Sequence, residues 1–275
     1  MSKKRILFIT QEMEPYSIAS DIATFVRKMP QYVHDKGFEI RILMPRFGTI
    51  NERRHRLHEV VRLSGMNIIV DDEDYPLIIK VASLPGARIQ VYFLDNEEFF
   101  KRKFIFTDED DKAFEDNTER MVFFCKGVIE TVKKFGWAPD IVHCSGWMAS
   151  LVPAYLKTVY KNDPIFQDAK VCYSVYADGI DPELKENFLD IAAINDLEPE
   201  QLSAYKANGS LSLQAGGVSF ADAVHVGSES IADDVRAAVD KVEVPVQEFA
   251  DLEETLPAML EFFTALLPAE EEEEA

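Results

Sequence analysis

Several side chains that could hold a substrate follow directly after apolar runs of the sequence. Hydroxyl groups and a carboxylate come after the run Arg5–Thr10, and two aromatic residues come at the ends of later runs. In open α/β sheets, ligands bind beyond the carboxyl ends of the strands. Polar groups there hydrogen-bond a ligand, and aromatic rings can stack on an apolar ligand face. The candidates from this reasoning are Tyr16, Ser17, Ser20, Asp21, Trp147 and Tyr176. For the two aromatic residues, the rim of the core is an equally good interpretation.

Other residues could bind a metal ion or form a disulfide, but their spacing argues against both. The three cysteines, Cys125, Cys144 and Cys172, lie far apart in apolar surroundings, and no Cys-x-x-Cys pair exists. The acidic run Asp71–Asp74 lacks the alternating ligands and the distal glutamate of a calcium loop. We therefore expect buried reduced thiols, a solvated hairpin, no metal and no resident cofactor.

A strand, a loop and a helix open the chain and must position the first candidates. Arg5–Thr10 is apolar and rich in β-branched and aromatic residues, as in a strand buried on both faces. From Asp21 the apolar residues follow helical spacing, and Ser20 or Asp21 can cap the helix. Glu39–Met44 is the next strand, after a glycine at position 37 that can end the helix. This βαβ unit places the loop at the carboxyl edge of a parallel sheet.

The next segments change the type of pairing. Strand-like runs at Met66–Val70, Leu77–Leu84 and Arg88–Asp95 are separated by short turns, which favour an antiparallel meander. A long helix then runs from Asp116 or Asn117 through Lys134, and Asp116 with Glu119 forms a capping-box pattern.

Strands and helices alternate over the rest of the chain. Strands are expected at Ile141–Cys144, Lys170–Tyr176 and Ala223–Val226, with helices at Met148–Tyr160 and from Ser228. The predicted fold class is α/β, a Rossmann-like doubly wound parallel sheet with an inserted antiparallel meander.

Composition excludes several classes of function. Of 275 residues, 47% are hydrophobic, which is enough for a sizeable core, and 49 acidic against 29 basic residues give a net charge of −20. That charge argues against a nucleic acid or an anionic membrane surface as partner. No apolar run approaches the ~20 residues of a membrane span, and no signal peptide is found. We therefore expect a cytoplasmic protein.

The C-terminal part is expected to be organised separately. Residues 1–241 form the α/β domain, residues 242–268 an amphipathic helical segment, and residues 269–275 a solvated acidic tail. Pro257 lies within the helical pattern or splits it in two. The segment either packs on the domain or docks a partner, which would be another protein or a second copy of this chain.

Five motifs resemble the bacterial glycogen synthases and plant starch synthases, in the same order and spacing. The helix from Asp116 to Phe124 resembles that family's "DN-x-ERF-x-FF", and Ala215–Val224 resembles its "KAGI-x-YAD-x-V". Asp140-Ile-Val-His-Cys-Ser-Gly-Trp147 resembles its "D-x-VH-x-x-DWH" turn. The other two are Arg5–Tyr16 with Arg41–Gly48, and Asp95–Phe100.

The resemblance implies the N-terminal half of a GT-B glycosyltransferase. That family transfers glucose from ADP-glucose or UDP-glucose to an α-1,4-glucan with retention of configuration, and its N-terminal domain mostly meets the acceptor. The resemblance adds Asn117, His143 and Ser145 to the substrate-binding candidates. Capping explains Asn117 without a substrate, and a histidine at the end of a buried strand is more often hydrogen-bonded structure than a functional group.

The sequence departs from the family at the positions of its chemistry. The family's Lys-Thr-Gly-Gly-Leu loop is Ile18-Ala19-Ser20-Asp21-Ile22 here, so an apolar residue replaces the phosphate-binding lysine and Asp21 would repel a diphosphate. Gly146 and Met148 replace the aspartate and the second histidine of the "DWH" turn. The family's Thr-x-His-Asn is Ser174-Val175-Tyr176-Ala177. No residue is therefore assigned a catalytic role.

Three hypotheses follow. The first is a degenerate single-domain member that binds glucan or serves as an accessory protein in glycogen metabolism. The second is an active glucosyltransferase whose second half is a separate chain. The third is a non-enzymatic interaction module that uses the C-terminal helix.

Overall fold

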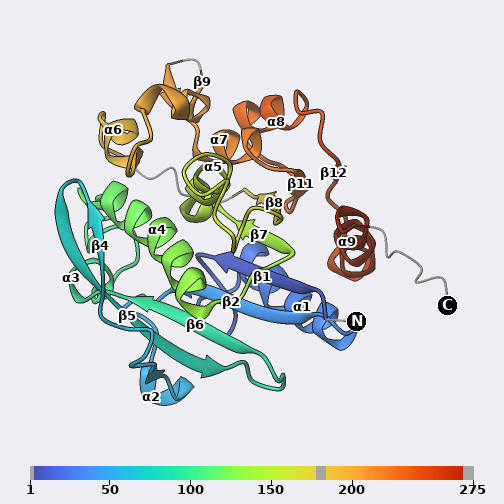
Figure 1. The fold of residues 1–275 in the computed structure, drawn as a ribbon, viewed down its shortest axis with the longest axis horizontal. Coiled ribbons are helices and arrows are strands. Elements are labelled where there is room, and N and C mark those ends of the chain that lie inside the picture. Colours follow the sequence, from blue (N-terminus) through green and yellow to red (C-terminus); the bar gives the residue numbers. More distant parts are fainter. Residues whose placement is uncertain (1–2, 178–183, 208, 269–275) are drawn as a thin grey trace.

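The structure is a computed structural model that describes residues 3–177, 184–207 and 209–268 (Figure 1). Its main sheet has the strand order β12-β11-β8-β7-β1-β2-β6-β5-β3, with β4 added to β5. The strands are β1 (Arg5–Thr10), β2 (Glu39–Pro45), β3 (His58–Glu59), β4 (Met66–Val70), β5 (Glu73–Ser83), β6 (Gln90–Asp95), β7 (Ile141–Ser145), β8 (Lys170–Val175), β11 (Ala223–Val226) and β12 (Val246–Gln247).

The strands from β12 to β6 are parallel, and β5 followed by β3 completes that end of the sheet with antiparallel pairing. The middle strands are buried on both faces, as their continuous apolar runs predict. The chain leaves β1 toward β2 on one side and later returns to β7 on the other side. The sheet therefore has a topological switch point between β1 and β7, and the predicted doubly wound fold is confirmed.

Helices cover both faces of this sheet. The helix α4 packs against α5, and α5 against α7, on one face, whereas α1 and α9 contact each other on the opposite face (Figure 1). The helices are α1 (Asp21–Asp35), α2 (Glu52–His55), α3 (Glu97–Phe100), α4 (Asn117–Phe135), α5 (Leu151–Lys157), α6 (Phe188–Ala192), α7 (Leu213–Ser219), α8 (Asp233–Val239) and α9 (Leu252–Leu266). Short 3-10 helices lie at Trp147–Ala149 and Pro199–Tyr205, and Lys206–Ala207 pairs with Ser210–Leu211 as a small hairpin of β9 and β10.

The predicted meander is confirmed. The strand β4 pairs with β5 and β5 with β6, both antiparallel, and β6 then joins β2 in parallel. The turn between β4 and β5 consists of Asp71 and Asp72, which have φ values of 49° and 63°. Two such residues give the turn whose twist matches a hairpin, so the acidic run is a solvated turn as expected.

Local predictions failed where tertiary contacts decide the conformation. The helix expected from Met148 begins as the 3-10 turn at Trp147, and the helix expected from Ser228 starts at Asp233. The short elements α2, β3 and α3 lie between the expected strands and helices and were not predicted. The capping box is also absent, because Asp116 binds the Arg102 guanidinium and makes no side-chain cap bond.

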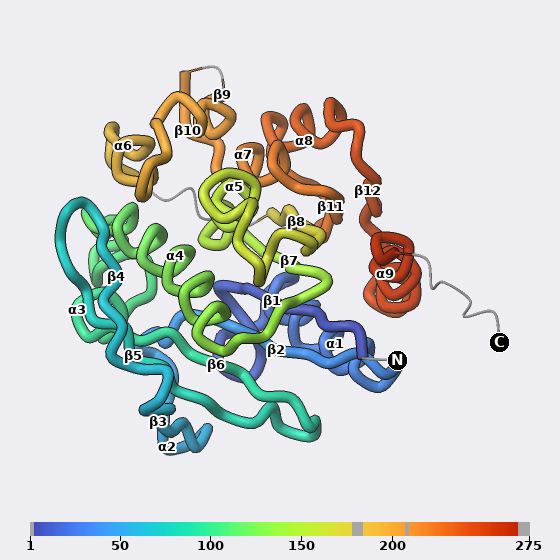
Figure 2. The backbone as a smooth tube through the Cα atoms, in the orientation of Figure 1, coloured from blue at the N-terminus to red at the C-terminus, as the bar shows by residue number. Residues whose placement is uncertain are grey.

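The C-terminal segment packs on the sheet rather than standing apart from it. The strand β12 extends the sheet beyond β11, and α9 lies beside it, at the end opposite the β4–β5 hairpin (Figure 2). The buried Phe263 ring lies 6.2 Å from Phe8 of β1 and 5.6 Å from His143 of β7. Pro257 lies inside α9 without splitting it. The boundary predicted between residues 241 and 242 falls between α8 and β12, and the acidic run 269–275 lies outside the described residues.

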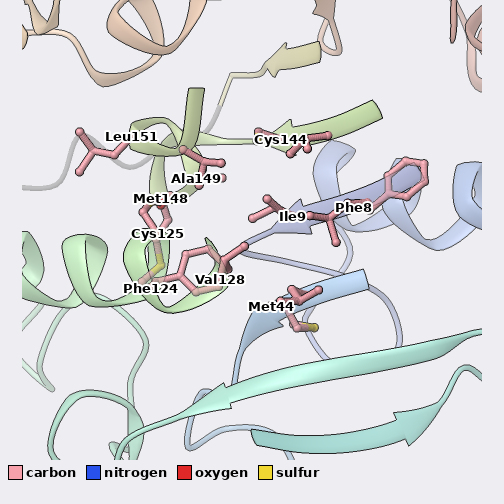
Figure 3. Close-up of a cluster of buried hydrophobic side chains, with 14 of the residues drawn as sticks. Phe8, Ile9, Met44, Phe124, Cys125, Val128, Cys144, Met148, Ala149 and Leu151 are labelled. Carbon is pink, nitrogen blue, oxygen red and sulfur yellow. Dashed lines mark hydrogen bonds between the residues drawn. The ribbon is translucent and has the colours of Figure 1, made fainter. Parts of the chain in front are cut away.

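The core between α4 and the sheet is continuous and apolar. Figure 3 shows Phe124, Cys125 and Val128 of α4 facing Ile9 of β1 and Met148 of the turn after β7. All three cysteines are buried and unpaired, as predicted, and burial raises the pKa of each thiol. In the part of the chain that the structure describes, no helix is long and apolar enough to cross a membrane.

We expect Gly48→Ala to lower the free energy of unfolding by about 3 kcal/mol. A Cβ atom at Gly48 would overlap the backbone oxygen of Arg102 and lie 2.7 Å from its nitrogen, and backbone cannot move aside as a side chain can. Urea denaturation measures the loss. Gly86→Ala is the control, since that turn has free space and only a φ of +76°, which costs about 1–2 kcal/mol. Losses of equal size would contradict the steric argument.

Candidate functional site

The loops after β1 and β7 meet at the topological switch point, where open α/β sheets bind ligands. The Gln11 side chain, 1% exposed, accepts a hydrogen bond from the Met148 backbone N–H at 3.0 Å. Gly146 has a φ of +78°, and a Cβ atom there would lie 2.8 Å from Oε1 of Gln11. This contact between the loops was not predicted, because the two residues are 137 positions apart in the sequence.

The start of α1 is closed by side chains of this chain. The Ser20 hydroxyl caps the helix by accepting the Ala23 N–H at 3.0 Å, and it donates to the Glu12 carboxylate. Asp21, in the first turn of α1, accepts a hydrogen bond at 2.6 Å from Ser228, which follows β11. Ser20 and Asp21 thus belong to an acidic, hydrogen-bonded edge of the domain.

The Ser228 hydroxyl joins this edge to a third loop. Its oxygen accepts the backbone N–H of Ala177, which follows β8, at 3.1 Å. The ends of β8 and β11 are therefore tied to the first turn of α1 through one hydroxyl group. The sequence offered no signal for Ser228 beyond its position after a predicted strand.

Tyr16 and Ser17 make contacts that hold their own loop in place. The Tyr16 ring is buried 4.9 Å from the Phe93 ring, and burial raises the pKa of its phenol to about 12. The Ser17 hydroxyl accepts the Met13 backbone N–H at 3.0 Å. Of the loop, Ile18 is the most exposed large apolar side chain, at 84%. The structure therefore gives Tyr16 and Ser17 contacts within the domain.

Trp147 and Tyr176 belong to the rim of the core. Each is 2% exposed. The Trp147 ring lies 4.8 Å from Phe106, and the Tyr176 ring lies 6.3 Å from His225. Neither ring presents an open face, so of the two interpretations offered for them the structural one fits this geometry.

His143 lies in a buried chain of hydrogen bonds across three strands. Its Nε2 lies 2.7 Å from the Ser174 hydroxyl, which in turn lies 2.9 Å from Nδ1 of His225. Ser145 lies 3.5 Å from the other ring nitrogen of His143. Burial lowers the pKa of both imidazoles to about 3, so both are neutral at pH 7. Sequence reasoning found His143 and Ser145 but missed Ser174 and His225.

Asn117 holds the segment before α4 in place. Its amide donates to the Phe106 carbonyl at 2.9 Å and accepts from the Arg120 guanidinium at 2.6 Å. Glu119 pairs with Lys185 instead of completing a cap. The structural interpretation of Asn117 is thus supported, although its contacts differ from the predicted cap.

A cleft of about 450 Å³ opens beside Asp21. Its walls come from the first turn of α1, the end of β11 and residues 249–255, which lead into α9. Asp251 adds a second carboxylate, and Phe249 adds an aromatic ring that is 40% exposed. Among the described residues, no group of three or more His, Cys, Asp or Glu side chains could hold a metal ion. The cleft therefore combines hydrogen-bond acceptors with an apolar wall.

Ser20→Ala is expected to lower the free energy of unfolding by about 1 kcal/mol, because α1 loses its N-cap and Glu12 loses one of its hydrogen-bond donors. Thermal or urea denaturation measures the change. Ser203→Ala, an exposed serine, serves as the control and should change stability by less than about 0.5 kcal/mol. An unchanged stability for Ser20→Ala would mean that the cap is replaced by water.

The strand order and the loops at the switch point define the class of this domain, a Rossmann-like half of a GT-B glycosyltransferase. The solved catalytic domain of Starch Synthase IV from Arabidopsis thaliana, bound to ADP and acarbose, has this fold. It matches with a TM-score of 0.68 at 18% identity, over 82% of this chain and 45% of that one.

Residues 5–243 match the family of the starch synthase catalytic domain, and the chain belongs to that family. It is 38% identical over 237 residues to a glycogen synthase of Chlorobium limicola, and 38% identical over 241 residues to one of Chlorobium phaeobacteroides. Each match covers 84% of this chain and 47% of the relative. The chain thus spans about half the length of these curated relatives, and the suspected kinship is confirmed.

Proposed function

We propose that this chain is a glycogen-synthase-like domain that binds α-1,4-glucan in glycogen metabolism and does not transfer glucose on its own. The observation that carries the proposal is the acidic, closed N-terminus of α1. The Ser20 hydroxyl accepts a hydrogen bond from the Ala23 N–H, and Asp21 and Glu12 add two carboxylates beside this hydroxyl. In this type of fold, the first βα turn binds phosphate through free N–H groups. The carboxylates repel a diphosphate but not an uncharged glucan.

The neighbouring groups support the same choice. The cleft beside Asp21 is lined by no lysine or arginine within the described residues, so it offers no cation to a phosphate leaving group. Carboxylates, hydroxyl groups and an exposed aromatic ring are suited to sugar hydroxyls and to the apolar face of a sugar ring.

Calorimetry with glycogen or maltooligosaccharides, and separately with ADP-glucose and UDP-glucose, tests this function. We expect heat of binding with the glucan and none with either nucleotide sugar. Binding of ADP-glucose or UDP-glucose by the wild-type chain would contradict the proposal. If neither the glucan nor a nucleotide sugar binds, a protein-interaction role would be favoured instead.

A two-part glucosyltransferase is the second candidate. It is favoured by the family match over residues 5–243, which keeps the whole N-terminal half of the fold. In this case the second half supplies the cations for the diphosphate. Mixing the chain with the purified nucleotide-binding half of a related glycogen synthase, and assaying glucosyl transfer, separates the two candidates. Transfer above the background of each part alone would establish the second.

We also infer a cytoplasmic protein whose α9 segment, residues 242–268, serves as the contact for a protein partner or a second copy. Support comes from the half-buried apolar side chains of α9, among them Leu260 and Phe262. Sedimentation velocity over a range of concentrations tests the homodimer. Deletion of the segment is unsuitable as a test of partner binding, because it would remove Met259 and Phe263 from the core and unfold the domain.

A further inference from the structure

The cleft beside Asp21 has walls of two origins. The first turn of α1 and the end of β11 lie within residues 5–243, which match the family, whereas Phe249 to Thr255 lie beyond them. The outer wall is therefore a feature of this chain that the family match does not cover. A volume of about 450 Å³ is within the range of small-molecule sites.

His225 is a buried residue that lines this cleft, and it can act as donor or acceptor. Its side chain is 1% exposed and lines the cleft, and within the described residues Nε2 has no hydrogen-bond partner. Nδ1 is bonded to Ser174, whose hydroxyl also contacts His143. A hydroxyl donates one proton and accepts another, so the two imidazoles can exchange tautomers through it. Nε2 of His225 can thus present either a proton or a lone pair to a ligand.

The remaining walls match a ring that carries several hydroxyl groups. Asp21 and Asp251 line the cleft, are exposed, and can accept O–H groups. Thr255 donates to the Ala250 carbonyl at 2.8 Å, which leaves its lone pairs as acceptors. The Phe249 ring offers a partly exposed apolar face. The combination of acceptors, one adaptable imidazole and an aromatic face suits a pyranose.

We propose that this cleft binds a single glucose unit, between Phe249 of the segment before α9 and His225 at the end of β11. The inference rests on the proposed glucan-binding function and names its site. The unit is either the end of a glucan chain or free glucose, and the two sources are separated by the probes below.

The experiment measures the binding of two ligands, glycogen and glucose, to the wild-type chain and to one pair of variants. Affinity electrophoresis in glycogen reports the glucan, and NMR titration with glucose reports the free sugar. Phe249→Ala should weaken the binding of a cleft ligand at least about fivefold, because it removes the aromatic face. Ile18→Ala is the matched control, since Ile18 is an exposed apolar side chain near the same edge that does not line the cleft.

The outcomes separate this inference from the proposed function. Glycogen binding that is weakened by Phe249→Ala but not by Ile18→Ala supports both. Glycogen binding that neither variant changes keeps the function and overturns the site. Glucose binding that depends on Phe249, without glycogen binding, keeps the site and overturns the function. Binding of neither ligand by the wild-type chain overturns both.

A counter-probe tests the chemical class. Tetramethylammonium would be held by the carboxylates of Asp21 and Asp251 and by the Phe249 ring, but it carries no hydroxyl group. If it binds with dependence on Phe249 while glucose does not, the cleft is a cation site and the proposal is wrong. Thr24→Val, which removes a lining hydroxyl at nearly constant volume, should weaken the binding of glucose but not that of tetramethylammonium.

Discussion

Arg120→Ala is expected to lower the free energy of unfolding by about 4 kcal/mol, the largest effect of any single substitution considered. The guanidinium is 1% exposed and donates to the carbonyls of Phe99 and Ile105 at 2.8 and 2.7 Å, and to Asn117 at 2.6 Å. Each buried acceptor left without a donor costs about 1–3 kcal/mol, and water that enters the space recovers part of this. Urea denaturation followed by circular dichroism measures the loss.

Two further variants make this result interpretable. Arg120→Lys should recover only part of the loss, because an ammonium group cannot donate in the planar fork that reaches all three acceptors. Arg53→Ala, an exposed arginine of α2, should change stability by less than about 0.5 kcal/mol. A loss below about 1 kcal/mol for Arg120→Ala would show that these hydrogen bonds are not structural.

Arg120 shows why a family motif need not mark a substrate site. Asn117 and Arg120 both match the family helix, and in this structure both hold the backbone before α4. The aromatic rings of Phe100, Phe106 and Phe114 surround the guanidinium at 5.4 to 5.8 Å. This burial lowers the pKa of Arg120 to about 10. The match to the family helix was therefore recognised from the sequence, whereas the structural role of Asn117 and Arg120 follows from tertiary packing.

The sequence predicted the fold where local patterns are strong. The buried strand Arg5–Thr10, the helix from Asp21 and the strand Ala223–Val226 were found with their observed bounds. Short elements such as α2 and β3 were missed, since four or two residues carry too little periodicity to be recognised. The strand β12 was also missed, because a two-residue edge strand is defined by its partner and not by its own sequence.

The site depends on contacts between distant residues. Asp21 and Ser228 are 207 positions apart, and Ser174 and His225 are 51 apart. The first candidates were found because a loop after a strand is a general ligand position. Their partners carry no motif, and Phe249 looked only like part of an apolar helical pattern. The acidic character of the edge was nevertheless foreseen from Asp21, the residue on which the proposed exclusion of a diphosphate rests.

The stability of the protein is expected to fall by about 4 kcal/mol between pH 7.5 and pH 5.0, because His143 and His225 are neutral and buried. Burial lowers the pKa of each imidazole to about 3, whereas in the unfolded chain the pKa is about 6.5. Below pH 6.5 the unfolded state therefore binds more protons than the folded state, and the stability decreases as the pH decreases. At pH 5.0 each histidine contributes a loss of about 2 kcal/mol.

Urea denaturation at the two pH values measures this difference, and it remains measurable in variants of altered overall stability. His225→Asn removes one buried imidazole and should reduce the difference to about half. His58→Gln, at an exposed histidine of β3, should leave it unchanged. Independently, the imidazole NMR signals of the folded protein should keep neutral nitrogen shifts down to pH 5. Protonated shifts at that pH would mean that the Ser174 bridge between the two rings accommodates a charge, and the argument from burial would fail.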